Sequence, residues 1–186
     1  KMEPGESGLI ALDWWNGNNC ILDDMYLSGC ILGMTLSTRS EDIYRALMES
    51  IAFGTRVNVE QFVKYGVRIN EVLASGGICK KNPLMMQIYA DVLNIPISVS
   101  KVSQGPALGS AMFGTVAAGK DGGYNTIFEA VTNMKAPIEK VYYPIPQHVQ
   151  IYNCLYEEYR KLHDYFGLGS NRVMYHLHDM KEKVRR

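Results

Sequence analysis

The fold is decided by residues 72–83, which read Val72-Leu73-Ala74-Ser75-Gly76-Gly77-Ile78-Cys79-Lys80-Lys81-Asn82-Pro83. The apolar start of this stretch, Val72–Ser75, predicts a short strand that runs directly into two glycines. Asn82 and Pro83 predict the start of a helix, because Asn caps helix N-termini and Pro is favoured at the first helical position. A strand, a glycine turn and a capped helix in succession are typical of an α/β domain.

The glycine pair Gly76-Gly77 is a candidate ligand contact. Glycine lets a ligand approach the backbone closely, and amide groups at a helix N-terminus can meet a phosphate or a base. Crevices at the carboxyl ends of strands are the usual ligand position in open α/β sheets. A Gly-Gly pair is, however, more often a purely structural turn, so the pattern alone leaves both interpretations open.

The regions around this stretch continue the alternation of strands and helices, which predicts parallel strands. Strands are expected at residues 8–15 and 97–100, and helices at residues 39–65, 106–118, 126–133 and 147–166. Residues 20–36 are expected to form loop and short helix. The remainder of residues 120–145 is expected to be a Pro-punctuated connector.

Apolar and small side chains at helical spacing predict which helix faces are buried. For the first helix, the sequence predicts a capping box at Thr38–Glu41 and one buried stripe, made of Leu47, Met48, Ile51, Ala52, Val59, Phe62 and Val63. For the helix at 106–118, a close-packed small face is expected, made of Ala107, Ser110, Ala111, Gly114, Ala117 and Ala118. The carboxylates of Glu49 and Asp91 are expected on solvated or interfacial helix faces.

Composition excludes several function classes. The chain has 186 residues, enough for one domain, and Lys+Arg and Asp+Glu balance at 19 each, which argues against a nucleic-acid-binding protein. It has no P-loop motif and no G-x-G-x-x-G after a strand. No apolar run is long enough for a membrane span, and the start has no signal-peptide pattern, so the expected location is cytoplasmic.

The four cysteines, Cys20, Cys30, Cys79 and Cys154, form no CxxC pair and have no histidine at zinc-ligand spacing. We therefore expect free thiols, buried or half-buried, in a reducing compartment. His176 and His178 in the basic tail are expected to be exposed and not to bind a metal.

Several segments resemble the FGGY family of carbohydrate kinases. Residues 29–34 with 42–49 resemble its second signature, from which Leu47 departs; residues 74–87 resemble its adenosine motif, and residues 104–111 the helix that follows. Residues 4–18 and 158–167 are similar to the L-ribulokinase branch of the family. The resemblance covers nearly the whole chain.

This resemblance implies a ribonuclease-H-like α/β fold of the actin and hexokinase ATPase type, with its first strands missing. It places ATP in a cleft between two such domains and implies a set of nucleotide-binding residues. Gly76 and Gly77 would pass under the adenosine and α-phosphate, and Lys81 or Asn82 would contact the base or ribose. Weaker candidates lie on the second-signature helix beside the adenine pocket, and these are Ala46, Glu49 and Ser50.

The reaction implied is transfer of the ATP γ-phosphate, with Mg²⁺, to the 5-hydroxyl of a ketopentose such as L-ribulose, in L-arabinose catabolism. The family's catalytic aspartate and phosphate loops match no position here, so no catalytic residue is nominated. Residues 1–166 are interpreted as the C-terminal, nucleotide-side domain and 167–186 as a basic tail. The missing N-terminal kinase domain is the expected partner, and a homo-oligomer is also possible.

Two further expectations follow from the missing parts. The chain alone should not phosphorylate a sugar, because phosphoryl transfer depends mostly on positioning by those parts. The short sheet should leave an edge that either pairs with another copy or is covered by the segment around Leu9–Trp15. The alternative hypothesis is a non-catalytic nucleotide-binding or regulatory module of the same fold.

Overall fold

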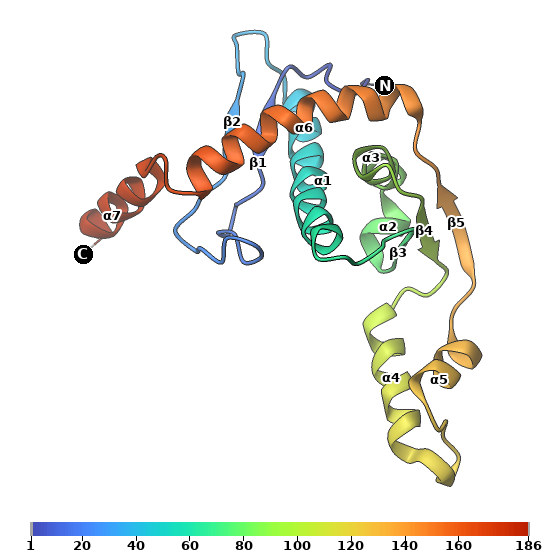
Figure 1. The fold of residues 1–186 in the computed structure, drawn as a ribbon. Helices are drawn as coiled ribbons and strands as arrows, with labels where there is room; N and C mark the ends of the chain where they lie inside the picture. The colour runs from blue at the N-terminus through green and yellow to red at the C-terminus, as the bar shows by residue number, and fades with distance from the viewer. Residues whose placement is uncertain (1, 186) are drawn as a thin grey trace. The chain divides into compact units, whose positions relative to one another are not determined.

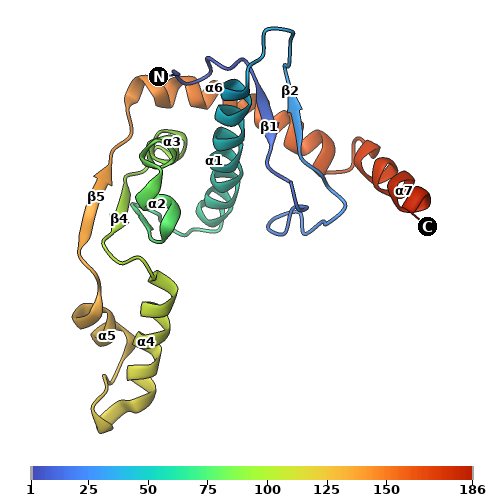
Figure 2. The ribbon, with the colours of Figure 1, turned by 180° about the vertical axis from the view of Figure 1, so that it is seen from behind.

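The computed structural model describes residues 2–185 and divides the chain into two compact units. Unit 1 comprises Lys1–Ile69, Ile88–Asn94 and Pro144–Arg186, and unit 2 comprises Asn70–Gln87 and Ile95–Tyr143. The elements of both units are labelled in Figure 1 and seen from behind in Figure 2.

Unit 1 is built on two antiparallel strands and two long helices. Strand β1 (Ile10–Leu12) pairs with β2 (Cys30–Leu32), and β1 packs against both α1 (Ser40–Lys64) and α6 (Pro146–Gly167). Figures 1 and 2 show α6 crossing α1 and β1. A last helix, α7 (Val173–Arg185), occupies the tail. Residues 30–32 were expected within loop and short helix, and that expectation is wrong because they complete a hairpin with β1.

The core of unit 1 is aromatic. The ring of Phe53 on α1 contacts the rings of Tyr152, Tyr156 and Tyr159 on α6, with centroids 5.4–6.1 Å apart. These tyrosines recur at helical spacing and all three are buried, so they form the inward face of α6. Trp14 is also buried, while its neighbour Trp15 is exposed, as expected of adjacent strand-like positions.

Helix α1 differs from the sequence prediction at both ends. Its N-cap is Arg39, whose amide donates to the Asp42 carboxylate at 2.9 Å, while the Thr38 hydroxyl accepts from the Thr35 amide. The capping interaction is therefore shifted by one residue. Of the predicted buried stripe, Met48 and Ala52 are buried, but Ile51, Phe62 and Val63 are exposed, so the prediction is wrong at these three positions.

Unit 2 contains a three-stranded sheet of order β3-β4-β5. Strand β3 (Val72–Ala74) pairs in parallel with β4 (Ile97–Ser100), and β4 pairs antiparallel with β5 (Ile138–Tyr142). The predicted strands at 72–75 and 97–100 are confirmed, whereas β5 was missed. Its burial pattern explains the miss, because only Tyr142 is buried and an exposed edge strand carries no apolar alternation.

The helices of unit 2 follow the predicted order. They are α2 (Gly77–Lys81), the first part of α3 (Pro83–Leu93), α4 (Gly105–Ala118), the short 3₁₀ helix η1 (Gly119–Asp121) and α5 (Ile127–Met134). Helices α4 and α5 lie side by side in Figures 1 and 2. Within α5, the Thr126 hydroxyl accepts from the Glu129 amide and caps the helix.

The small face of α4 is not buried. All six residues expected to form a close-packed contact are exposed, namely Ala107, Ser110, Ala111, Gly114, Ala117 and Ala118, and Met112 is the buried residue of this helix. The predicted burial of this face is wrong. Small residues at helical spacing show that another element could pack closely against the helix, but they do not show that such an element is present.

Three further observations concern the cysteines, the segment before residue 16 and the helix lengths. All four cysteines are free, but Cys20 and Cys154 are exposed, so the expected burial holds only for Cys79 and, in part, Cys30. The segment around Leu9–Trp15 contains β1, which pairs with β2 within unit 1. Across residues 2–185, no helix combines the length and the apolar character needed to cross a membrane.

Candidate nucleotide-binding site

The glycine turn lies at the carboxyl end of β3. Gly76 has φ +101° and ψ −172°, a conformation that side-chain-bearing residues rarely adopt, and α2 begins at Gly77. A Cβ atom built at either glycine would meet no heavy atom within 4 Å. The backbone of the turn is therefore open, and no neighbouring atom would exclude a side chain at either position.

Short hydrogen bonds fix the turn and the helix after it. The Cys79 thiol donates to the Gly76 carbonyl at 3.0 Å. The Oδ1 atom of Asn82 accepts from the Met85 amide at 3.0 Å, which is the N-cap interaction predicted for the start of α3. The turn is thus held in one conformation before any ligand binds.

A second element reaches the same edge of the sheet. Strands β3 and β4 are parallel, so both carboxyl ends face one edge, and α4 begins shortly after β4. A Cβ atom on Gly105, the first residue of α4, would lie 2.2 Å from the Ser75 Oγ atom. Glycine at 105 therefore lets the start of α4 lie against the turn, which the sequence motif alone did not indicate.

The two lysines at the end of α2 differ in their partners. The Lys80 ammonium group donates to the carbonyl oxygen of Lys101 and lies 3.7 Å from the Glu139 carboxylate. Both partners belong to unit 2, so Lys80 is engaged in contacts within that unit. Lys81, the lysine predicted to contact the base or ribose, is exposed. Both lysines are exposed, and the two contacts described distinguish Lys80 as the one bound within unit 2.

The remaining candidates, Ala46, Glu49 and Ser50, lie on α1 in unit 1 and are buried. The Glu49 carboxylate accepts from Arg45 Nε at 2.7 Å and from the Tyr152 hydroxyl at 3.0 Å. Burial raises the pKa of Glu49 above its usual range, and the bonds from Arg45 and Tyr152 oppose that rise. The expectation that Glu49 lies on a solvated or interfacial face is wrong, because this ion pair holds it in the core.

Asp91 is also buried, contrary to the sequence expectation. It is 2% exposed, and its carboxylate accepts from the Ile145 amide at 2.8 Å and lies 2.8 Å from His148 Nδ1. These contacts satisfy polar groups at the start of α6, where the first amides of a helix lack intrahelical partners. Asp91 therefore has a structural role in unit 1.

Among the described residues, no group of three or more His, Cys, Asp or Glu side chains is arranged to hold a metal ion. The glycine turn combines an open backbone, a capped helix start and an exposed lysine at the carboxyl edge of parallel strands.

Comparison with known proteins identifies the family of the chain. Residues 2–118 match the C-terminal domain of the FGGY family of carbohydrate kinases. The ribulokinases of Anoxybacillus flavithermus and Geobacillus thermodenitrificans are each 54% identical over 183 residues, which is 98% of this chain and 32% of theirs. The chain thus spans about a third of the length of these relatives.

The fold is similar to that of solved sugar kinases. A ligand-bound xylulose kinase from Lactobacillus acidophilus superimposes with a TM-score of 0.75 at 24% identity, over 88% of this chain and 32% of that one. The actin-type ATPase fold predicted from the sequence is confirmed by this likeness. The family match covers more than half of the chain, so it settles the relationship that the motifs had suggested: the chain belongs to the FGGY family of carbohydrate kinases.

Proposed function

We propose that the chain supplies the adenosine-binding part of an ATP-dependent sugar kinase. The kinase would transfer the ATP γ-phosphate to the 5-hydroxyl of a ketopentose such as L-ribulose. Family membership supports the reaction class, and the identity to ribulokinases supports the choice of sugar. Because ATP is the phosphate donor in the cytoplasm, the enzyme would act there.

The single observation that carries the proposal is the open glycine turn. Gly76 and Gly77 would lie under the adenosine and α-phosphate, where their lack of side chains allows close approach. Lys81 and Asn82 would contact the base or ribose. Ala46, Glu49 and Ser50 are buried on α1 in unit 1, and the weaker assignment of these three residues to nucleotide binding stays a prediction.

Mg²⁺ would be held by the nucleotide phosphates and by residues outside this chain, and it would neutralise charge during transfer. The contribution of this chain is to bind and orient the nucleoside end. Positioning is most of the catalysis in phosphoryl transfer, so a fixed nucleoside places the γ-phosphate for attack.

The experiment that tests the proposal substitutes Gly77 in the full-length kinase. Gly77 has neither a positive φ nor a neighbour that a side chain would strike, so Gly77→Val should fold normally. Its side chain would occupy the ligand's space, and ATP affinity should fall at least about tenfold, about 1.4 kcal/mol. Gly114→Val is the matched control, since Gly114 on α4 also has open space around it, and its affinity should not change. Unchanged ATP affinity in folded Gly77→Val enzyme would refute the proposal.

The chain alone should be inactive. A coupled-enzyme assay of the purified chain with ATP, Mg²⁺ and L-ribulose should give no turnover above background, because nothing in it matches the family's phosphate loops or catalytic aspartate. Reproducible turnover from independent preparations would show that the catalytic parts lie within these residues.

A further inference from the structure

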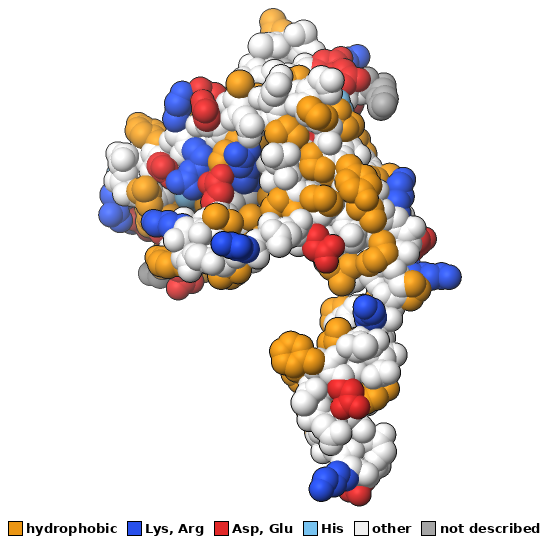
Figure 3. All heavy atoms as spheres, turned by 45° about the vertical axis from the view of Figure 1, so that its right-hand side comes forward, with side chains coloured by type: hydrophobic (Ala, Val, Ile, Leu, Met, Phe, Trp, Pro, Cys, Tyr) orange, Lys and Arg blue, Asp and Glu red, His pale blue; other side chains and the backbone are white. Residues whose placement is uncertain are grey.

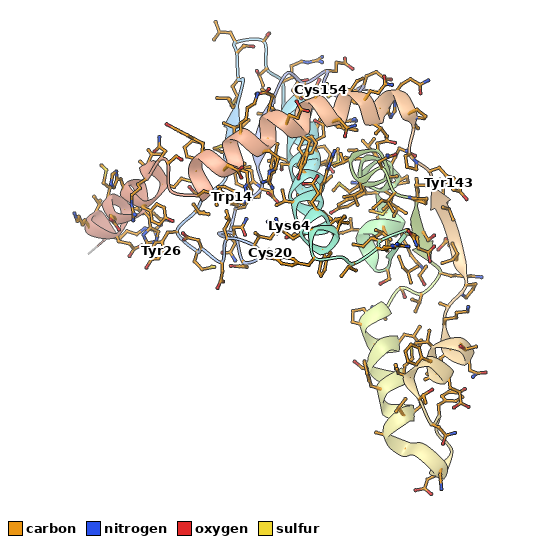
Figure 4. The ribbon with its side chains drawn as sticks, viewed as in Figure 1. Trp14, Cys20, Tyr26, Lys64, Tyr143 and Cys154 are labelled. Atoms are coloured by element: carbon orange, nitrogen blue, oxygen red, sulfur yellow. The ribbon has the colours of Figure 1, made fainter. Side chains whose placement is uncertain are left out.

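The connector between β4 and α4, residues 101–104, is bonded at its start to the helix that follows the glycine turn. The Lys80 ammonium group, at the end of α2, donates to the carbonyl oxygen of Lys101. The amide of Lys101 donates in turn to the carbonyl oxygen of Pro137, just before β5, at 2.9 Å. Figure 4 shows the connector as the loop that leaves the sheet and enters α4. Both backbone groups of Lys101 therefore hold the start of the connector in place within unit 2.

The connector ends at Gly105, where space explains the choice of glycine. A positive φ, which favours glycine, occurs at Gly76 but not at Gly105. The space for a side chain on Gly105 is filled by Ser75, the residue between β3 and the glycine turn. Four residues along the same helix, the Cβ position of Gly109 has no heavy atom within 4 Å. The steric requirement for glycine in this part of α4 is therefore confined to the contact with Ser75.

A side chain at position 105 could not be accommodated by rotating the Ser75 side chain. Rotation about the Cα–Cβ bond of Ser75 moves its Oγ atom, but the Ser75 Cβ atom would still lie 2.9 Å from a Cβ atom on Gly105. Carbon atoms in contact prefer separations of about 3.5–4.0 Å. The backbone of the turn, or of the start of α4, would therefore have to move by roughly half an ångström.

From this geometry we propose that Gly105 is a positioning residue for the nucleotide, acting through Ser75. Its contact with Ser75 sets the distance between the start of α4 and the glycine turn, and Lys80 fixes the other end of the same connector. The role rests on the proposed function, since the position of the turn matters only if the nucleotide lies on it. Binding groups must be held to within about 0.5 Å of their productive geometry, which is the size of the shift that a Cβ atom would force.

The test compares Gly105→Ala with Gly109→Ala in the full-length kinase. Both substitutions add one methyl group to α4, but only the first would meet Ser75. Gly105→Ala should raise the KM for ATP at least about fivefold, with kcat and the KM for the ketopentose within about twofold of the parent values. Gly109→Ala should leave all three parameters unchanged. A loss of folded enzyme would lower kcat without raising the KM for ATP alone, so this split separates positioning from stability.

A second substitution tests whether the effect passes through Ser75. Ser75→Gly removes the atoms that a Cβ atom on Gly105 would meet. Gly105→Ala combined with Ser75→Gly should therefore have a KM for ATP within about twofold of that of Ser75→Gly alone. An unchanged KM for ATP in folded Gly105→Ala enzyme, or no recovery in the folded double variant, would overturn the proposal.

Lys80 decides the proposal if Gly105→Ala does not fold, as judged by circular dichroism. Lys80→Met removes the donor to the Lys101 carbonyl and should raise the KM for ATP about two- to threefold, whereas Lys80→Arg keeps a donor and should not. An unchanged KM in Lys80→Met would then overturn the positioning role.

Gly77→Val, measured in parallel, separates this proposal from the proposed function. If Gly77→Val weakens ATP binding and neither Gly105→Ala nor Lys80→Met raises the KM for ATP, the turn binds the nucleotide and only the positioning role is wrong. If Gly77→Val has no effect on ATP binding, the nucleotide does not lie on the turn and both proposals are wrong.

Discussion

The helices of the two units differ in the side chains that they bury. In unit 1, α1 and α6 bury charged and polar side chains in specific pairs, such as Arg45 with Glu49. In unit 2, α4 buries Met112 and exposes its small residues together with Phe113, and Phe128 on α5 is also exposed. Figure 3 shows hydrophobic side chains at the surface of this part of unit 2. Helices α1 and α6 therefore pair polar side chains within a buried core, whereas α4 and α5 each bury a single residue, Met112 and Ala130.

This difference shows that side chains at helical spacing can lie either on a buried or on an exposed face of a helix. The tyrosines of α6 and the small residues of α4 both recur at helical spacing. The tyrosines are buried against α1, while the alanines of α4 are exposed. Periodicity therefore identifies the face of a helix that is suited to burial, and the structure shows whether the chain itself buries it.

The largest expected effect is on the buried ion pair of unit 1. Arg45 Nε lies 2.7 Å from Glu49 Oε1, and both side chains are almost fully buried. Arg45→Leu leaves the Glu49 carboxylate buried without its cation, which should lower the free energy of unfolding by about 3–5 kcal/mol in urea denaturation. The double variant with Glu49→Leu should recover much of this loss. A loss below about 1 kcal/mol in Arg45→Leu would show that unit 1 does not depend on the pair.

The next effect concerns the hydroxyl that joins α6 to this pair. The Tyr152 hydroxyl accepts from Arg45 Nη2 at 2.8 Å and donates to Glu49 at 3.0 Å. Tyr152→Phe keeps the ring and leaves two buried polar groups with one partner fewer, so unfolding should become easier by about 1–3 kcal/mol. Cys154→Ala, at an exposed position of the same helix, is the control. Equal melting temperatures for Tyr152→Phe and the control would contradict the account of this network.

A buried alanine and an exposed alanine compare the two units directly. Ala52 on α1 is 0% exposed, whereas Ala111 on α4 is exposed. Ala52→Leu should overpack unit 1 and cost roughly 1–3 kcal/mol, measured by thermal melting. Ala111→Leu in the same chain should change stability by no more than about 0.5 kcal/mol. Similar losses for both variants would mean that the small face of α4 is covered in solution.

The smallest effect is a pH dependence in unit 1. Burial raises the pKa of Asp13 above its ordinary value of 3.8, so the folded chain holds this proton more tightly than the unfolded chain. The stability from this proton is complete below 3.8 and is lost as pH rises through the folded pKa. Asp13→Asn does not titrate, so its melting temperature relative to the parent should rise between acid and neutral pH. A difference that stays constant with pH would show that the Asp13 pKa is not raised.

Much of the fold could be predicted from the sequence because local signals were strong. The glycine turn, the Asn82 cap and the strands on either side required only short-range chemistry, and they hold in the structure. Strand β5 could not be found, because its residues are mostly exposed at a sheet edge and carry no apolar pattern. The pairing of Glu49 with Arg45 has helical spacing, but its burial depends on Tyr152, which is distant in the sequence.

The candidate site was predictable in part for the same reason. Gly76 and Gly77 belong to a local motif, whereas the close approach of Gly105 to Ser75 depends on the parallel pairing of β3 and β4. The burial of Asp91 depends on Ile145 and His148, which contact it from the start of α6. Contacts between distant segments were beyond what spacing along the chain reveals.

The central claim, that the turn in unit 2 contacts the nucleotide, is tested most directly by amide chemical-shift mapping. Backbone resonances of the 186-residue chain would be followed by NMR during titration with ATP and Mg²⁺. The account predicts that the largest shifts occur at Gly76, Gly77 and Asn82, with Glu49 and Ser50 in the buried face of α1 little changed. Saturating shifts that leave the glycine turn unaffected, or no shift at any nucleotide concentration, would contradict it.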